Sequence, residues 1–287
     1  MIISIASGKG GTGKTTVAVN LALSVGANLQ LLDCDVEEPN AHLFVKPVWD
    51  YSETVTTPVP QVDEAKCTYC GKCEDICQFK AIVVVGEMIL PFHELCHSCG
   101  GCSAVCPENA ISEVGRELGV VQKGQRNGIE FIHGKLRVGE AMAPPLIKHV
   151  LSRRNSQKTI IVDAPPGTSC PVIETMKPAD FVLLVTEPTP FGLHDLKLAF
   201  GAVRTLDIPC GLVINRSDIG DGNVRQYALE QNLPVLMEIP FERQIAEAYS
   251  RGEVVVEVLP KWKEQFLVLF DKVRKLATQR TGAGEKS

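Results

Sequence analysis

The sequence lacks three features that would assign it at once to a special class of protein. Basic residues are not in excess, because 29 Lys and Arg stand against 34 Asp and Glu and give a formal net charge of −5. No nucleic acid or anionic lipid partner is therefore expected. No run of roughly 18 apolar residues occurs, which predicts that no helix spans a membrane. Eleven cysteines in 287 residues are too few, and the chain is too long, for a disulfide scaffold.

What remains is an ordinary globular composition. Hydrophobic residues make up 45% and charged residues 22% of the chain, enough for one large domain or two smaller ones. The segment Met1–Ala6 is apolar but short and has no basic region before it, so it is interpreted as a buried strand and not as a signal peptide. We expect a cytoplasmic protein, where thiols stay reduced and clustered cysteines indicate metal binding before disulfides.

Apolar segments alternate with helical patterns along most of the chain. Runs such as Ile160–Val162 and Phe181–Val185 lack polar alternation, which is typical of strands buried on both faces of a parallel sheet. The expected strands are Ile2–Ala6, Leu29–Asp33, Ile129–Ile132, Thr159–Asp163, Asp180–Thr186, Cys210–Asn215 and Pro234–Ile239. The expected helices are Lys14–Val25, Gly139–Arg153, Phe191–Leu206, Asn223–Gln231, Phe241–Ser250 and Lys261–Ala277.

One part of the chain breaks this alternation. Residues 47–66 contain prolines and show little periodicity, so they are interpreted as a connection. Residues 67–111 hold eight cysteines. We predict an α/β fold with a mainly parallel sheet covered by helices, built from residues 1–60 and 116–277. A small α+β module of residues 61–115 is inserted in it, and the small, polar tail 278–287 is expected to be disordered.

A glycine-rich loop follows the first strand and opens the first helix. Its sequence is Gly8-Lys9-Gly10-Gly11-Thr12-Gly13-Lys14-Thr15, which matches the pattern G-x-x-x-x-G-K-[ST]. Backbone N–H groups of such a loop turn toward phosphate oxygens, and the helix N-terminus adds partial positive charge. We expect Lys14 to reach the β- and γ-phosphates, the Thr15 hydroxyl to bind Mg²⁺, and Thr16 to belong to the same site. This predicts a P-loop NTPase fold.

The stretch Lys9–Thr16 resembles the deviant phosphate loop of the MinD, ParA, Mrp and nitrogenase iron-protein superfamily, in the SIMIBI class. In that superfamily the early lysine, here Lys9, touches the partner's nucleotide in a dimer that sandwiches ATP. The resemblance implies an ATPase whose catalysis involves Lys9 and Lys14. It also implies an ATP-dependent homodimer, or a heterodimer with a related subunit.

The strand that ends in Asp33 and the strand Thr159–Asp163 carry the same resemblance. It implies that Asp35 orients or deprotonates the attacking water and that Asp33 supports Mg²⁺ through water. Asp163 would hold Mg²⁺ in its outer shell, and the N–H of Gly167 would sense the γ-phosphate. The alternative for Asp35 and Asp163 is simple capping at a strand end.

Two late strand ends resemble the base-binding segments of the superfamily. The resemblance implies that Asn215 bonds the adenine edge, with Arg216 beside it, and that the stretch around Pro240 frames the base. An Asn at a strand end is also common in turns, which is the alternative. Because no Lys-x-Asp follows Asn215, ATP is preferred over GTP.

The eight clustered cysteines form two matching runs. They are Cys67-x2-Cys70-x2-Cys73-x3-Cys77 and Cys96-x2-Cys99-x2-Cys102-x3-Cys106. Equivalent residues lie 29 positions apart, so the runs are an internal repeat. Each has the bacterial ferredoxin spacing, which predicts two [4Fe–4S] clusters related by a pseudo-twofold axis.

The spacing also predicts which thiolates share a cluster. Two-residue gaps let one tight loop present three thiolates, and the fourth comes from the other run. The first cluster is assigned to Cys67, Cys70, Cys73 and Cys106, and the second to Cys96, Cys99, Cys102 and Cys77. Zinc is the alternative, but two triplets and two single thiolates fit it poorly.

Five further residues near or outside these runs are singled out. Gln78 follows Cys77 where the pattern prefers proline, and we expect a looser turn or altered solvent access there. His97 is expected at the surface or as a tuning hydrogen-bond partner. Cys34 and Cys210 are expected to be core residues. The remaining cysteine, Cys170, lies shortly after Gly167, in the neighbourhood where the nitrogenase iron protein has a ligand of its bridging cluster. A bridging cluster would lack ligands here, because no second cysteine occurs between Ile111 and Asp163, and the role of Cys170 stays open.

Three functions fit these motifs. We prefer an ATP-hydrolysing protein that passes electrons through two [4Fe–4S] clusters to a redox partner. The alternative is an ATPase that assembles or carries iron–sulfur clusters or another metal cofactor for an acceptor protein, although no late C-x-x-C pair occurs outside the two runs. A MinD-like positioning ATPase is disfavoured, because the stripe Trp262, Phe266, Phe270 and Val273 is interpreted as a core helix and not as a membrane anchor.

Overall fold

The computed structural model describes residues 1–281, with side chains through Thr278. The chain forms two compact units. The larger contains Met1–Ser52, Val121–Lys135 and the chain from Ile147 onward; the smaller contains Glu53–Val120 and Leu136–Leu146. Both cysteine runs lie in the smaller unit.

The larger unit is built on a mainly parallel sheet, as the sequence predicts. The strand order is β11-β10-β9-β1-β8-β2-β7-β6-β3, and every neighbouring pair from β11 to β7 is parallel. The strands are β1 Ile2–Ala6, β2 Leu29–Asp33, β3 Val48–Val62, β6 Ile111–Arg126, β7 Ile129–Leu136, β8 Thr159–Asp163, β9 Phe181–Thr186, β10 Cys210–Asn215 and β11 Val235–Ile239. In this register Asp163 of β8 lies opposite both Ile5 of β1 and Asp33 of β2. The carboxyl ends of β1, β2 and β8 therefore meet, which is where ligands bind in open α/β sheets.

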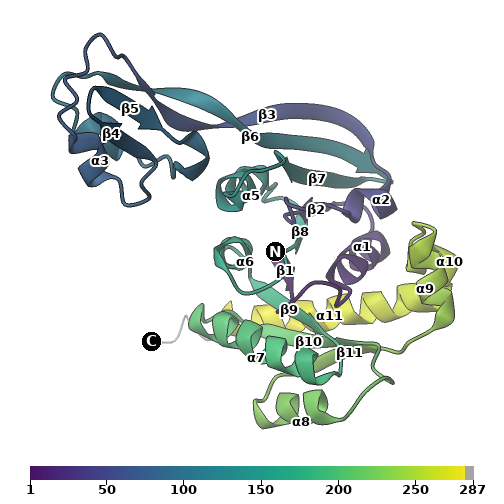
Figure 1. The fold of residues 1–287 in the computed structure, drawn as a ribbon. Helices are drawn as coiled ribbons and strands as arrows, with labels where there is room; N and C mark the ends of the chain where they lie inside the picture. Colours follow the sequence, from purple (N-terminus) through teal and green to yellow (C-terminus); the bar gives the residue numbers. More distant parts are fainter. Residues whose placement is uncertain (282–287) are drawn as a thin grey trace. The chain divides into compact units, whose positions relative to one another are not determined.

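Helices cover both faces of this sheet. Helices α1 and α11 pack side by side on one face with α10, whereas α6, α7 and α8 pack on the other (Figure 1). The helices of the larger unit are α1 Lys14–Val25, α2 Ala41–Val45, α6 Cys170–Met176, α7 Pro190–Thr205, α8 Asn223–Glu230, α9 Arg243–Ser250, α10 Val255–Val258 and α11 Pro260–Thr281. Helix α5, Ala143–Ser152, begins in the smaller unit and continues into the larger. The predicted helices are present with small shifts of their ends, and the short helices α2, α6 and α10 had not been predicted.

The predicted connection at residues 47–66 is wrong, because most of it is strand β3, Val48–Val62. Its burial alternates, with Val55, Thr57 and Val59 buried and Thr56 and Pro58 exposed. Proline removes a backbone donor, but β3 is the last strand in the sheet order, and an edge strand tolerates that loss. The prolines therefore marked an edge strand and not a break in structure.

Strand β6 was also missed, and so was the turn that follows it. Asn127 and Gly128 join β6 to β7 with φ of 50° and 80°. Two consecutive residues at positive φ are typical of the type I′ turn of a hairpin, and Asn-Gly is its strongest sequence signal. Arg126 anchors the end of β6, because its Nη1 donates to the carbonyl oxygens of Phe44 (2.9 Å) and Val45 (3.0 Å).

The C-terminal helix α11 is part of the core, as predicted. Trp262, Phe266 and Val273 are buried against the sheet, and each such side chain contributes roughly 1.5–3 kcal/mol. The expected disorder is wrong for residues 278–281, because the helix continues to Thr281. The Thr278 hydroxyl donates to the carbonyl oxygen of Arg274 (3.0 Å), so a polar side chain did not end the helix. Residues 282–287 lie outside the described residues. No described helix is long and apolar enough to cross a bilayer.

The smaller unit has its own, repeated architecture. Its two-stranded antiparallel sheet is accompanied by short helical segments. These elements are β4 Ile82–Val85, β5 Met88–Pro91, α3 Lys72–Ile76, α4 Gly101–Ala104 and the single 3₁₀ turn η1 His93–Leu95. Segments of β3 and β6 also belong to this unit. A small apolar core of Ile82, Ile89 and Ile111 packs against the cysteines.

Candidate functional site

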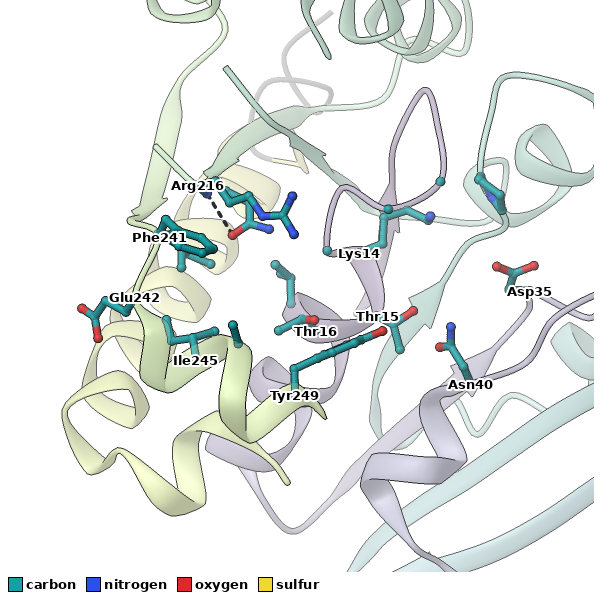
Figure 2. Close-up of a pocket in the computed structure, with 18 of the residues that line it drawn as sticks. Lys14, Thr15, Thr16, Asp35, Asn40, Arg216, Phe241, Glu242, Ile245 and Tyr249 are labelled. Atoms are coloured by element: carbon teal, nitrogen blue, oxygen red, sulfur yellow. Dashed lines mark hydrogen bonds between the residues drawn. The ribbon is translucent and has the colours of Figure 1, made fainter. Parts of the chain in front are cut away.

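A cavity of about 470 Å³ lies at the carboxyl ends of the central strands of the larger unit. The phosphate loop forms one wall, and α1 begins at Lys14 directly after it. Gly13 requires its glycine, because φ is 93° and a Cβ there would meet the Asn215 side-chain nitrogen at 2.5 Å. The loop therefore holds Lys14, Thr15 and Thr16 at a helix N-terminus facing the cavity (Figure 2).

Asp163 supplies a buried carboxyl next to this loop. It ends β8 and is buried, and neither of its oxygens makes a well-formed hydrogen bond within the protein. Burial raises its pKa to about 7, and the positive charge of Lys14 and the nearby Thr15 hydroxyl oppose that rise. A buried carboxylate is costly unless a cation or donor satisfies it. The Asp163 carboxyl and the Thr15 hydroxyl therefore offer oxygen ligands of the kind that a hard cation such as Mg²⁺ prefers.

Asp33 and Asp35 follow β2 but have different surroundings. Both oxygens of Asp33 accept backbone N–H bonds, from Asp35 (3.2 Å) and from Ala41 at the start of α2 (3.0 Å). Burial, and then the nearby Asp163, raise the pKa of Asp33 well above its usual range. Asp35 instead lines the cavity, and burial raises its pKa to about 6 against the effect of Lys14. Asp33 therefore orders the segment that presents Asp35.

The raised pKa of Asp35 gives a pH-dependent test. If Asp35 accepts a proton from water, it must be ionised, so ATP hydrolysis should fall as the pH is lowered through about 6. Stability should change in the opposite direction. Because the folded pKa lies above the unfolded value of about 3.9, ionisation of Asp35 destabilises the nucleotide-free fold as the pH rises from about 4 to about 6.

Asp35→Asn should remove that part of the pH dependence, which denaturant unfolding at pH 4.5 and pH 7 will measure. It should also abolish hydrolysis at every pH. A variant that keeps the full pH profile of hydrolysis would contradict the role assigned to Asp35.

The opposite wall of the cavity is formed by the segments after β10 and β11. Asn215, Arg216 and Pro240 line it. The Asn215 amide is already engaged, because its Nδ2 donates to the Thr12 carbonyl oxygen (3.0 Å) and its Oδ1 accepts from the Arg216 N–H (3.0 Å). This residue therefore links the wall to the phosphate loop, and Arg216 pairs with Glu187 (3.0 Å).

Several lining residues were not predicted. Helix α9 contributes an apolar surface, and the Tyr249 ring extends from it toward Thr15 and Thr16 (Figure 2). Further unpredicted lining residues are Val17, Glu38, Asn40, Glu242, Ile245 and Ala246, whereas Phe241 belongs to the predicted stretch around Pro240. The spacing of Ile245, Ala246 and Tyr249 on one helix face, just after Pro240, was the available signal.

The residues that line the cavity do not include the predicted Gly8, Lys9, Thr12, Asp163 and Gly167. Lys9 is half-buried, and it does not line the cavity. Gly167 has φ of 99°, and its N–H donates to the Ser7 carbonyl oxygen at the base of the phosphate loop (3.0 Å). If the Gly167 N–H donated to a phosphate oxygen, it would have to give up its hydrogen bond to the Ser7 carbonyl oxygen.

The eight cysteines of the smaller unit line two cavities, four to each. Cys67, Cys70, Cys73 and Cys106 line the first. Cys77, Cys96, Cys99 and Cys102 line the second. Each cavity thus combines three cysteines of one run with the last cysteine of the other. No three His, Cys, Asp or Glu side chains within the described chain form a group that would hold a single metal ion.

The backbone around the two cavities repeats with the sequence. Positive φ occurs at Tyr69, Gly71 and Lys80 and again 29 residues later, at Ser98, Gly100 and Asn109. The N–H groups of Tyr69 and Ser98 each donate to the first sulfur of their run at 3.4 Å. Those of Ala81 and Ala110 each donate to the last sulfur at 3.2 Å.

Replacing proline by Gln78 therefore leaves the turn unchanged. The N–H bond to Cys77 has the same length as its counterpart at Cys106, and the expected loosening is not observed. His97 is exposed, as expected, and its ring stacks on Phe79 with centroids 3.4 Å apart.

The three remaining cysteines differ in exposure. Cys34 is fully buried and Cys210 is half-buried in β10, which confirms the core prediction for Cys34 and largely for Cys210. Burial raises the pKa of the Cys210 thiol to about 11, so it is not a reactive thiolate. Cys170 is exposed at the first position of α6.

Comparisons with known proteins agree with the fold. An uncharacterized protein of Methanocaldococcus jannaschii is 34% identical over 281 residues, which are 96% of each chain. An iron-sulfur cluster carrier protein of Aquifex aeolicus is 25% identical over 274 residues, 89% of this chain and 61% of that protein. Among solved structures, the septum site-determining protein MinD of Pyrococcus horikoshii with Mg-ADP has a TM-score of 0.61 at 22% identity, covering 96% of each chain.

The family assignment rests on a match to a family model that covers most of the chain. Residues 3–256 match the family described as the CobQ/CobB/MinD/ParA nucleotide binding domain. That match includes the phosphate loop, the ends of β2 and β8 and both segments of the opposite wall. The chain belongs to the CobQ/CobB/MinD/ParA family of nucleotide-binding domains.

Proposed function

We propose that this protein is an ATPase whose smaller unit carries two [4Fe–4S] clusters and passes electrons through them to a partner protein. The observation that carries the proposal is the sorting of eight cysteines into two cavities of four, each completed by the opposite run. ATP binding and hydrolysis would take place in the cavity of the larger unit.

The cysteine cavities fit [4Fe–4S] clusters in their donor chemistry. Four thiolates surround each cavity, and apolar side chains such as Val84, Ile89 and Ile82 complete the walls. Backbone N–H groups point at the sulfurs of both runs, which stabilises thiolate charge. Such a cluster supplies one-electron redox chemistry when bound. The protein's own part is to hold it and to limit its contact with water.

The nucleotide cavity fits ATP with Mg²⁺. Lys14 and the loop N–H groups would bind the phosphates, and Thr15 and the Asp163 carboxyl would hold the cation. Asp35 would orient or deprotonate water. Asn215, Arg216 and the Pro240 segment would meet the base. Gly167 would sense the γ-phosphate by leaving the Ser7 carbonyl oxygen.

The interlocked cysteines favour electron transfer over cluster delivery. Each cluster would take three ligands from one run and the fourth from the other. Release of one cluster would therefore also loosen a run that holds the other cluster. A protein that delivers clusters must release them, whereas a protein that transfers electrons must retain them.

Cluster delivery is the second candidate, because relatives at about one-quarter identity are named iron-sulfur cluster carrier proteins. The test is to reconstitute the clusters and mix the protein with an apo-ferredoxin, with and without MgATP. Retention of the clusters supports electron transfer. Rapid transfer of iron to the apo-ferredoxin only when MgATP is present would establish the carrier function instead.

We also propose that ATP drives dimerisation with a second copy or a related subunit through Lys9. In support, Lys9 does not line the cavity of its own chain. Lys9→Ala should weaken ATP-dependent dimerisation in light scattering and lower hydrolysis, whereas Lys263→Ala, on the exposed side of α11, should do neither. Unchanged dimerisation and hydrolysis in Lys9→Ala would remove this role.

A further inference from the structure

The β4–β5 hairpin has two apolar faces. The strands pair with Val83 opposite Leu90 and Val85 opposite Met88, while Ile82 faces Pro91 and Val84 faces Ile89. Cross-strand partners share a face, and alternate residues of a strand share a face. One face is therefore made of Ile82, Val84, Ile89 and Pro91. The other, called here the outer hairpin face, is made of Val83, Val85, Met88 and Leu90.

The first of these faces covers the first cysteine cavity. Ile82 and Ile89 are buried with the cysteines, and Val84 packs against them. Val84 and Ile89 also line the cavity with Cys67, Cys70, Cys73 and Cys106. The thickness of one two-stranded sheet therefore separates the outer hairpin face from that cavity.

The outer hairpin face is exposed in spite of its composition. Val85, Met88 and Leu90 have exposed fractions of 54%, 58% and 42%. An antiparallel sheet with one free face normally presents polar side chains there. A contiguous exposed apolar surface of this kind marks an interaction site.

Charge and size indicate what binds there. The smaller unit carries eleven acidic and five basic residues, a net charge of −6, and the rest of the chain is close to neutral at +1. A second copy would bring another smaller unit of the same net negative charge. Four side chains also fall short of the roughly 800 Å² that each partner of a stable dimer buries, whereas transient electron-transfer contacts lie at the low end of interface size.

We propose that the outer hairpin face is the docking surface for a one-electron redox protein with a positively charged rim around an apolar centre. This proposal rests on the proposed electron-transfer function and names the kind of partner that the function requires. A cluster held by Cys67, Cys70, Cys73 and Cys106 would supply one electron, which a low-potential donor had given it, and the partner's cofactor would gain that electron. No bond forms or breaks and no proton moves.

The test uses cytochrome c as a basic one-electron acceptor and ferricyanide as a small acceptor that needs no docking surface. Holoprotein is reduced with dithionite, freed of excess reductant, and mixed with each acceptor in a stopped-flow instrument with MgATP. Val85→Arg places a positive charge on the outer hairpin face. Val138→Arg makes the same change on the same unit at a residue that is 95% exposed and lies outside the hairpin.

We expect Val85→Arg to slow cytochrome c reduction by about tenfold, because like charge is placed at the docking site. Val138→Arg should slow it by no more than about twofold, through net charge alone. Met88→Arg should repeat the effect of Val85→Arg. Iron content and the ferricyanide rate should be unchanged in all three, which shows that the clusters are intact.

Equal rates for Val85→Arg and Val138→Arg would overturn the docking surface while leaving the proposed function standing. Sedimentation without nucleotide tests whether a second copy of the chain binds this face instead. A wild-type dimer that Val85→Arg dissociates would assign the face to a second copy and overturn the proposal of a redox partner. Failure of the wild-type protein to reduce either acceptor would overturn the proposed function, and this surface with it.

Discussion

Replacing Cys106 by alanine will remove the cluster of the opposite run. Cys106 belongs to the second run but lines the cavity of Cys67, Cys70 and Cys73. Iron content should fall by about half, from the roughly eight irons that two [4Fe–4S] clusters contain. The visible absorbance that remains should be that of one cluster.

Two double variants identify which cluster is lost. Cys106→Ala with Cys67→Ala should lose no more iron than Cys106→Ala alone, because both changes affect one cavity. Cys106→Ala with Cys96→Ala should lose nearly all of it, because the changes affect both cavities. Cys170→Ala, outside both runs, is the control and should lose none. If the outcomes of the two double variants are exchanged, each run holds its own cluster and the interlocked arrangement is wrong.

Lys14→Ala will abolish ATP hydrolysis without changing the visible absorbance of the clusters. Lys14 opens α1 and lines the nucleotide cavity, and an amine that stabilises charge on the transferring phosphate is worth at least about a hundredfold in rate. The cysteine cavities lie in the other compact unit, so their iron should be unaffected.

Hydrolysis is measured by phosphate release and the clusters by absorbance near 400 nm on the same sample. Lys263→Ala should leave both at the wild-type level. Loss of both signals together in Lys14→Ala would show that the two units do not fold independently. Retained hydrolysis would contradict the site itself.

The parallel sheet was the most predictable part of the fold. Strands β1, β2, β8 and β10 and helix α1 begin and end at the predicted residues, because strands buried on both faces are nearly continuous apolar runs. Strands β3 and β6 were missed for the opposite reason. They lie at the edge of the sheet and carry polar and charged residues on their exposed side, and prolines in β3 resembled a connection.

The candidate site was predictable where it depends on local spacing. The phosphate loop and the two cysteine runs carry their geometry in a few consecutive residues, and the structure places four cysteines at each of two cavities. Tyr249 and Asn40 reach the cavity only through the packing of α9 and α2, which no local pattern encodes. For the same reason the bond of Asn215 to the Thr12 carbonyl oxygen was not foreseen.

The most direct test of nucleotide-gated electron transfer is the rate at which reduced holoprotein reduces cytochrome c with MgATP, with MgADP and without nucleotide. Coupling between two sites is typically worth about 5–150-fold, so MgATP should change the wild-type rate by at least about fivefold while iron per chain stays constant. Lys14→Ala should show the same rate under all three conditions. An identical rate in wild-type protein with and without MgATP, with the clusters intact, would contradict the coupling of ATP to electron transfer.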